Sequence, residues 1–101
     1  MDVDVFEKYG IELPTIEDAD AVDNPKIVAK FTTGEWNWYV IGGDKLKNSD
    51  YYLYGLVDGI YRELGMFTLS QIQSVGASLS PNFEKIGLYD LIGDLDNKKG
   101  V

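Results

Sequence analysis

The chain has no cysteine and no histidine among its 101 residues. The absence of cysteine excludes disulfides, thiolate nucleophiles and cysteine-ligated zinc or iron-sulfur sites, and it is ordinary in a reducing cytoplasm. The absence of histidine removes the side chain most used for proton transfer near neutral pH, together with Ser-His and Cys-His pairs and histidine metal sites. We therefore expect no enzyme, no catalytic residues, no metal site and no cofactor.

Basic residues are scarce as well, since nine Lys and Arg stand against seventeen Asp and Glu and leave a net charge of -8. A charge of this sign repels nucleic-acid phosphates and anionic membranes, so neither direct nucleic-acid binding nor membrane association is expected. The chain has no apolar run of transmembrane length, and residues 1–4 lack the features of a signal peptide. The sequence predicts a soluble cytoplasmic protein.

The length and the apolar share, 45% of 101 residues, fit one domain with a single modest core. The pattern along the chain divides this domain, residues 1–101, into three parts. They are an acidic N-terminal arm over residues 1–25, a β-rich core over 26–95 and a frayed tail over 96–101.

The N-terminal arm holds eight of the seventeen acidic residues and a single basic one. Asp4 and Thr15 are typical helix N-cap residues, and Gly10 can end the helical turn that Asp4 begins. One interpretation is a helical or irregular arm that docks through its apolar side chains and leaves its acids in water. The other is an acidic recognition site, with the candidate residues Glu17, Asp18, Asp20 and Asp23.

The middle of the chain shows the alternation of β-strands, with strands expected over residues 27–31, 35–41, 51–57 and 60–67. The second of these has two chemically distinct faces. One face carries Trp36, Trp38 and Val40, and the other carries Glu35, Asn37, Tyr39 and Ile41. The polar, glycine-containing stretch 42–50 is expected to be a mobile hairpin loop.

The dipeptide Asp58-Gly59 favours a two-residue hairpin turn, which requires a positive φ at both positions. This turn predicts one core face, formed by the opposed pairs Val57 with Ile60, Leu53 with Leu64, and Tyr51 with Met66. The reverse face is too aromatic for a fully solvated surface, so we expect another part of the chain to cover it. Its residues are Tyr52, Tyr54, Leu56, Tyr61, Glu63 and Phe67.

Thr68 followed by Gln71 is a capping-box pattern, which predicts a helix near residues 69–75 that ends near Gly76. Apolar residues after Pro81 predict a further short strand or helix. The fold class expected from these elements is α+β. It has an antiparallel β-sheet of about four or five strands with one or two short packed helices.

Three sequence blocks occur in a characteristic order, at residues 27–39, 54–59 and 63–72. In this order they resemble, over residues 11–90, the bacterial family numbered 2958 among domains of unknown function. Members are small proteins often encoded on plasmids, conjugative elements and phages, sometimes beside antirestriction genes. The resemblance implies a role in mobile-element biology without naming an activity. The chain departs from the family at residues 84–89, so a function tied to that run is not carried over.

The aromatic side chains of the expected sheet offer a binding surface. A stacking platform for single-stranded nucleic acid needs a basic groove, which the surrounding acids do not provide. A protein-binding face with exposed tyrosine anchors has no such requirement. We therefore favour a non-enzymatic protein-interaction module with a protein partner, and the sequence does not indicate its oligomeric state. Its candidate binding residues are Tyr52, Tyr54, Tyr61 and Glu63.

Two alternatives stay open. The first is an acidic, nucleic-acid-mimicking inhibitor of a restriction or CRISPR effector, in which the acids of the arm stand in for phosphates. The second is a carboxylate-based enzyme, although no spacing of Asp and Glu requires one. Salt separates the first alternative from the module, because charge-based binding weakens as ionic strength rises and an apolar contact changes little.

Overall fold

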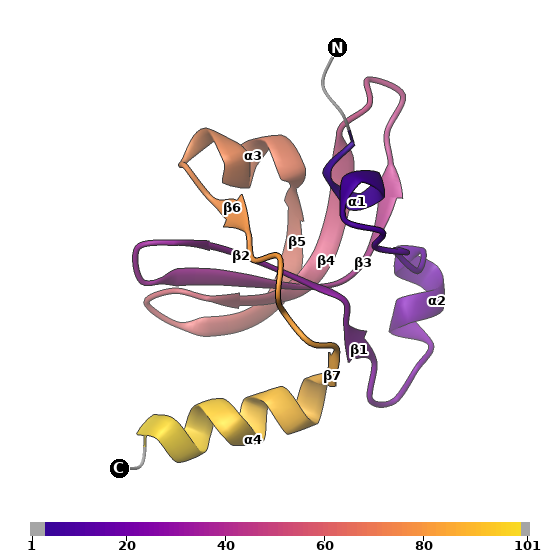
Figure 1. The fold of residues 1–101 in the computed structure, drawn as a ribbon. Helices are drawn as coiled ribbons and strands as arrows, with labels where there is room; N and C mark the ends of the chain where they lie inside the picture. The colour runs from indigo at the N-terminus through magenta and orange to yellow at the C-terminus, as the bar shows by residue number, and fades with distance from the viewer. Residues whose placement is uncertain (1–3, 100–101) are drawn as a thin grey trace.

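The structure is a computed structural model that describes residues 4–99 and has an α+β fold, as predicted (Figure 1). An antiparallel sheet of five strands has the order β5-β4-β3-β2-β6, and β1 pairs with β7 in a separate two-stranded sheet. The strands are β1 (Lys26–Ile27), β2 (Ala29–Thr33), β3 (Trp36–Lys45), β4 (Tyr51–Asp58), β5 (Arg62–Thr68), β6 (Ser78–Leu79) and β7 (Ile86–Gly87). The helices are α1 (Val5–Lys8), α2 (Ile16–Asp20), α3 (Leu69–Ser74) and α4 (Leu88–Lys99).

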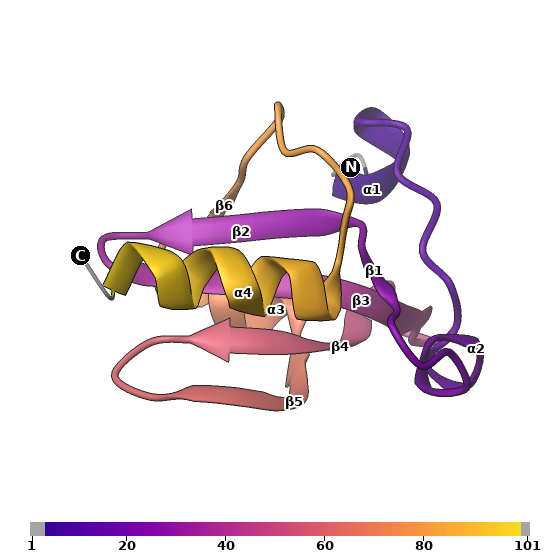
Figure 2. The ribbon, with the colours of Figure 1, turned by 90° about the horizontal axis from the view of Figure 1, so that it is seen from below.

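Both faces of the large sheet are covered. Helices α1 and α3 lie on one side and α4 lies along the other (Figures 1 and 2). The α3-side core consists of Phe6, Ala29, Phe31, Trp38, Val40, Leu53, Phe67, Leu69, Ile72 and Ala77. The α4-side core consists of Ala19, Ile27, Tyr39, Ile41, Leu56, Leu88 and Leu91. Alternate residues of β3 therefore enter different cores, which confirms the two distinct faces predicted for this strand.

The N-terminal arm is helical at both predicted caps. Asp4 caps α1, and its side chain accepts hydrogen bonds from the backbone N–H groups of Phe6 and Glu7. The Thr15 side chain caps α2 by accepting from Asp18 N–H. Burial of the Phe6 ring beside α3 holds the arm on the sheet.

Strand β3 is longer than predicted. Residues 42–45, expected to belong to a mobile loop, pair with β4 after a bulge between Val40 and Gly42. The arm packs closely on this part of the strand, because a Cβ at Gly42 would lie 2.9 Å from the Ala19 Cβ. Gly43 N–H also donates to the Pro14 carbonyl. These glycines therefore make room for the arm, and only residues 46–50 remain outside the strands of this hairpin.

The turn between β4 and β5 is also longer than predicted. Asp58 pairs with Arg62, so residues 59–61 form the turn. Gly59 does not have the positive φ that the predicted turn requires. A Cβ at Gly59 would lie 2.3 Å from the ring of Trp36, so the glycine is needed for a side-chain contact and not for the predicted turn.

The longer turn changes the register of β5. Leu53 pairs with Phe67 instead of Leu64, a shift of three residues from the prediction. An odd shift moves every side chain of the strand to the other face. Phe67 therefore enters the α3-side core, while Leu64 and Met66 leave the predicted core face and lie exposed beside Tyr54 and Leu56. The predicted partner pairs and the predicted core face of β5 are wrong for this reason.

The C-terminal part of the described chain is also more regular than predicted. Helix α3 begins at the predicted capping box, in which the Thr68 and Gln71 side chains each bond the other's backbone N–H. Helix α4 extends through Asn97 to Lys99, so residues 96–99 of the predicted frayed tail are helical. Packing of Leu88 and Leu91 against the sheet explains this order. The rest of that prediction, residues 100–101, lies outside the described residues.

Candidate functional site: an apolar surface at the edge of the sheet

The structure separates the four residues predicted to bind a protein. Tyr52 and Tyr54 alternate with Leu53 along β4 and lie on the face that α4 covers. Tyr54 packs against the α4-side core, as the aromatic composition predicted, and Tyr52 stays exposed. Tyr61 lies in the turn before β5, and Glu63 points to the opposite face from Tyr52. These residues do not form one continuous surface.

A different set of side chains does form a surface, and we call it the apolar edge surface. Its members are the exposed large apolar residues at and beside β5, namely Trp36, Ile60, Tyr61, Leu64 and Met66. Together with Val57, Glu63 and Gly65 they line a shallow hollow of about 330 Å³. Ile60 and Tyr61 are the most exposed members, at 79% and 77%. The surface thus includes the two predicted residues Tyr61 and Glu63.

Local packing explains why this surface stays open. The Trp36 ring stacks on Trp38, with centroids 6.0 Å apart, and lies against Gly59. Trp38 is buried in the α3-side core, whereas Trp36 lies at the end of the strand and stays exposed. The three-residue shift of β5 leaves Leu64 and Met66 exposed on the other face of the sheet, beside Leu56 and Tyr54. The apolar edge surface therefore extends around the edge of the sheet, with Trp36 on the α3 side. The sequence placed Trp36 on one face with Trp38 and Val40, but it did not indicate that the Trp36 ring would lie exposed against Gly59.

Strand β5 forms one margin of the five-stranded sheet, and Figure 2 shows no element beyond it among residues 4–99. A strand in this position leaves every second backbone N–H and C=O group without a partner in the sheet. The opposite margin, β6, contains only two residues. The apolar edge surface therefore combines exposed apolar side chains with free backbone hydrogen-bonding groups.

Arg62 at the start of β5 connects the edge to α4. Its guanidinium lies 2.7 Å from an Asp96 carboxylate oxygen and 3.8 Å from one of Asp58. The Arg62 side chain is largely buried, and the carboxylates of Asp58 and Asp96 balance its positive charge within the molecule. Arg62 is the one basic residue of the strand, and it is not available to attract an anionic partner.

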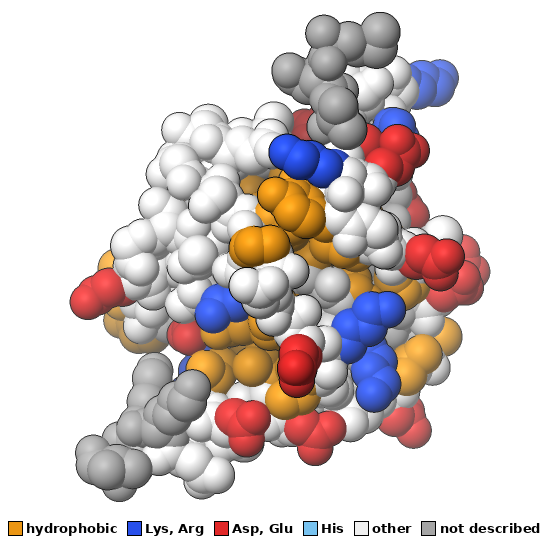
Figure 3. All heavy atoms as spheres, viewed as in Figure 1, with side chains coloured by type: hydrophobic (Ala, Val, Ile, Leu, Met, Phe, Trp, Pro, Cys, Tyr) orange, Lys and Arg blue, Asp and Glu red, His pale blue; other side chains and the backbone are white. Residues whose placement is uncertain are grey.

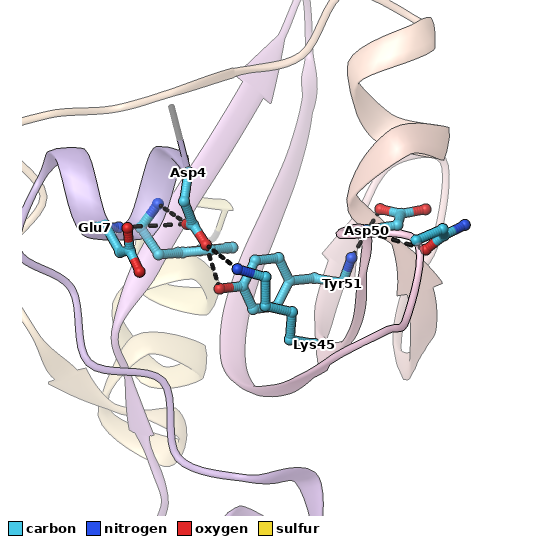
Figure 4. Close-up of polar contacts among 7 residues, drawn as sticks. Asp4, Glu7, Lys45, Asp50 and Tyr51 are labelled. Atoms are coloured by element: carbon cyan, nitrogen blue, oxygen red, sulfur yellow. Dashed lines mark hydrogen bonds and ion pairs between the residues drawn. The ribbon is translucent and has the colours of Figure 1, made fainter. Parts of the chain in front are cut away.

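Asp4 lies at the centre of a polar cluster where α1 meets the β3–β4 hairpin, and its carboxylate accepts the hydrogen bonds of this cluster (Figure 4). Its carboxylate accepts from Tyr51 Oη at 2.5 Å and pairs with Lys45 Nζ at 3.4 Å. Burial raises the pKa of Asp4, but the hydrogen bonds from Tyr51, Glu7, Phe6 and Lys45 outweigh burial and hold the pKa below its usual value. Burial and the Asp4 carboxylate together raise the pKa of Tyr51 to about 12.

A second carboxylate, Asp50, links the same hairpin to the start of α3. It accepts from the Ser70 hydroxyl at 2.6 Å, from Ser70 N–H at 3.0 Å and from Tyr51 N–H at 2.8 Å. The Ser70 hydroxyl is the main cause of the lowered pKa of Asp50. Asp50 and Asp4 both line a hollow of about 490 Å³. Both carboxylates are held ionised by protein donors, so they join segments of the chain and are poorly suited to take up a proton.

The four candidate acidic residues lie on and just after α2. Glu17, Asp18, Asp20 and Asp23 are all exposed, while Ala19 turns inward to the α4-side core. Figure 3 shows acidic side chains on the side of the molecule where α2 lies in Figure 1. Among residues 4–99, no three or more His, Cys, Asp or Glu side chains are grouped to hold a metal ion. Over the same residues, no helix is both long enough and apolar enough to span a membrane.

Comparisons with protein-family models, with curated proteins and with solved structures found no match. The resemblance to the family numbered 2958 therefore stays a prediction from the three sequence blocks.

Proposed function

We propose that this protein is a non-enzymatic protein-interaction module, which binds a partner protein through the apolar edge surface. The observation that supports this function is the gathering of Trp36, Ile60, Tyr61, Leu64 and Met66, all exposed, around one hollow at the margin of the sheet. Scattered exposed apolar residues are normal on a small protein, but a contiguous group of this kind is typical of an interaction site.

The chemistry of the surface favours a protein over other ligands. Tyr and Trp are frequent anchors of protein interfaces, because they bury a large apolar area and keep a polar group for hydrogen bonding. The hollow has a single ionisable wall residue besides Tyr61, namely Glu63, so it offers little to an anion. The net charge of -8 also opposes nucleic acid and anionic membranes.

We further propose that the module comes from a bacterial mobile element and acts in the cytoplasm. The resemblance of three sequence blocks to the family numbered 2958 supports a bacterial mobile element, such as a plasmid or phage, as its origin. The absence of cysteine supports a cytoplasmic location. In this setting the partner is a host protein or another protein that the element encodes.

One observation supports the acidic decoy as a second candidate. The four acids on and after α2 are all exposed, and none of them forms an ion pair within the described part of the chain. They are therefore free to face a basic nucleic-acid site on an effector protein. Their confinement to one short helix and the following turn makes the contact small compared with a duplex groove, so we place the decoy second.

A capture experiment with matched variants tests the two candidates. The bait is the tagged protein in bacterial lysate, washed at low and at high salt, with bound proteins identified by mass spectrometry. The edge variant is Ile60→Ser with Tyr61→Ser, and its control is Tyr89→Ser on α4, where the ring is also exposed. We expect a partner that persists at high salt, because an apolar contact is weakened little by ionic strength. This partner should be lost only from the edge variant. Both replaced side chains lie in an exposed turn outside the cores, so the variant should still fold.

The acid variant in the same experiment replaces Glu17 with Gln and Asp18, Asp20 and Asp23 with Asn. A partner lost from this variant and at high salt, but retained by the edge variant, would favour the decoy. Capture of the same proteins by all baits would contradict both candidates. Circular dichroism of each bait checks that a lost partner does not reflect lost folding.

A further inference from the structure

Strand β5 carries its two charged residues, Arg62 and Glu63, at its start, and its centre lacks the features that keep edge strands from pairing with other chains. Natural edges are usually short, bulged, or interrupted by proline or by a central lysine. Strand β5 has seven residues, contains no proline or lysine, and pairs with β4 without a register shift. Its three central residues, Leu64, Gly65 and Met66, are uncharged. A Cβ at Gly65 would meet no atom within 4 Å, so the middle of the strand is open to an approaching backbone.

We propose that the occupant of this edge is a second copy of the chain, whose β5 pairs antiparallel with β5 about a twofold axis at Gly65. The two five-stranded sheets then form one continuous sheet of ten strands. This inference rests on the proposed function, since it assigns a partner to the β5 part of the apolar edge surface. Ile60 and Tyr61 precede the strand and stay outside the new ladder.

The position of the axis follows from the length of the strand. Gly65 is the midpoint of Arg62–Thr68, so only an axis at this residue pairs the strand along its whole length. An axis moved toward the N-terminus would extend the ladder into the turn at residues 59–61. An axis moved toward the C-terminus would extend it into α3, whose backbone is helical from Leu69.

The side chains are self-complementary in this register. Leu64 lies opposite Met66 of the second copy, so two such apolar pairs flank the axis on the face that α4 covers. Glu63 lies opposite Phe67, and Arg62 lies opposite Thr68, so no like charges face each other. The strand carries one acid and one base, and the excess of acids lies elsewhere in the chain. This pairing is what favours a second copy over an unrelated strand.

Cysteine cross-linking tests the register directly, because the chain has no cysteine of its own. Residues opposite each other at the axis have Cα atoms about 4.5 to 5.5 Å apart, within the range of about 4.4 to 6.8 Å that a disulfide requires. Gly65→Cys is expected to form a disulfide-linked dimer on mild oxidation, read on a non-reducing gel. Leu64→Cys is the control, since its two copies lie two positions out of register. Equal cross-linking of the two variants would contradict the proposed axis.

Sedimentation equilibrium tests the assembly without cross-linking. The wild-type protein is expected to dimerise reversibly, and Met66→Lys is expected to weaken the dimer at least tenfold, because a lysine would enter the centre of the ladder. Ile60→Lys is the matched control and should leave the dimer intact, as Ile60 lies outside β5. A wild-type protein that stays monomeric at several hundred micromolar would overturn this inference. The capture experiment would then still decide the proposed function, because its edge variant changes only residues of the turn.

Discussion

At the scale of single residues, Asp4 and Tyr51 connect the N-terminal arm to the sheet. Tyr51 Oη donates to Asp4, whose other oxygen caps α1, so one carboxylate serves two elements. The Tyr51 ring also packs edge-on against Phe6, with centroids 4.8 Å apart. The arm depends on this contact, because Phe6 is its one buried aromatic residue.

Replacing Tyr51 with Phe keeps the ring and removes the hydroxyl, so it isolates the hydrogen bond to Asp4. We expect a loss of about 1 kcal/mol in the free energy of unfolding near pH 8, a typical value for one hydrogen bond. Urea unfolding measures it. Tyr61→Phe is the control. The Tyr61 ring is exposed, so removing its hydroxyl should not measurably change the free energy of unfolding.

The hydrogen bond between Tyr51 and Asp4 also predicts that the protein loses stability at alkaline pH. The pKa of Tyr51 is raised from the usual value near 10 to about 12, so the folded state holds this proton more tightly than the unfolded chain. The stabilisation is complete below about pH 10 and is lost as pH rises from there to about 12. Urea unfolding between pH 8 and 11 should therefore show a steeper decline for the wild-type protein than for Tyr51→Phe. Parallel declines would rule out this role of Tyr51.

Gly55 permits the closest backbone approach in the sheet. A Cβ there would lie 2.0 Å from the carbonyl oxygen of Tyr39, and both residues are in central strands that cannot move apart. Gly55→Ala is expected to destabilise the protein by at least about 3 kcal/mol, at the upper end of overpacking effects. Gly65→Ala is the matched control on the neighbouring strand, where the space is open. Similar unfolding midpoints for the two variants would contradict so close an approach between β3 and β4.

At the scale of elements, the sequence predicted what local chemistry determines. The caps at Asp4, Thr15 and Thr68 each depend on residues two or three positions away, and the structure confirms all three. The alternation within β3 is confirmed as well, because side chains of a strand point to opposite faces whatever the partner strand is. The α+β class followed from these local features.

The turn before β5 and the register of β5 were predicted wrongly, because contacts between segments distant in the sequence determine them. Gly59 indicated a tight turn, but its partner is the Trp36 ring, which is far away in the sequence. The resulting shift of β5 exposed Leu64 and Met66, so most of the apolar edge surface was not predicted. Tyr61 was expected within the strand, and the longer turn places it outside β5, where its ring is exposed.

Helix α4 is the clearest case of an element formed by tertiary packing. It contains Gly93 and several aspartates, all poor helix formers, and its buried face is held by Leu88 and Leu91. Leu91→Ala should cost about 3 kcal/mol in unfolding free energy, as is usual for a buried leucine. Tyr89→Ala on the exposed face is the control and should change stability by less than about 0.5 kcal/mol. Chemical denaturation that gives equal losses would show that α4 is not docked through Leu91.

At the scale of the whole molecule, the charge of -8 and the apolar edge surface act in opposite directions on association. Two copies repel each other through their net charge, and this repulsion acts over a Debye length of about 10 Å at 0.1 M salt. The proposed ladder instead depends on backbone hydrogen bonds and on apolar contacts between Leu64 and Met66, which salt hardly weakens.

Dimerisation should therefore strengthen several-fold as salt rises from about 0.02 to 0.3 M, because screening removes the repulsion and leaves the contact unchanged. Sedimentation equilibrium of the wild-type protein at both salt concentrations measures this. The variant with Glu17→Gln, Asp18→Asn, Asp20→Asn and Asp23→Asn removes four negative charges and should show a smaller salt effect. A dimer that weakens with salt would instead be held by attraction between charges, which the uncharged centre of β5 cannot provide.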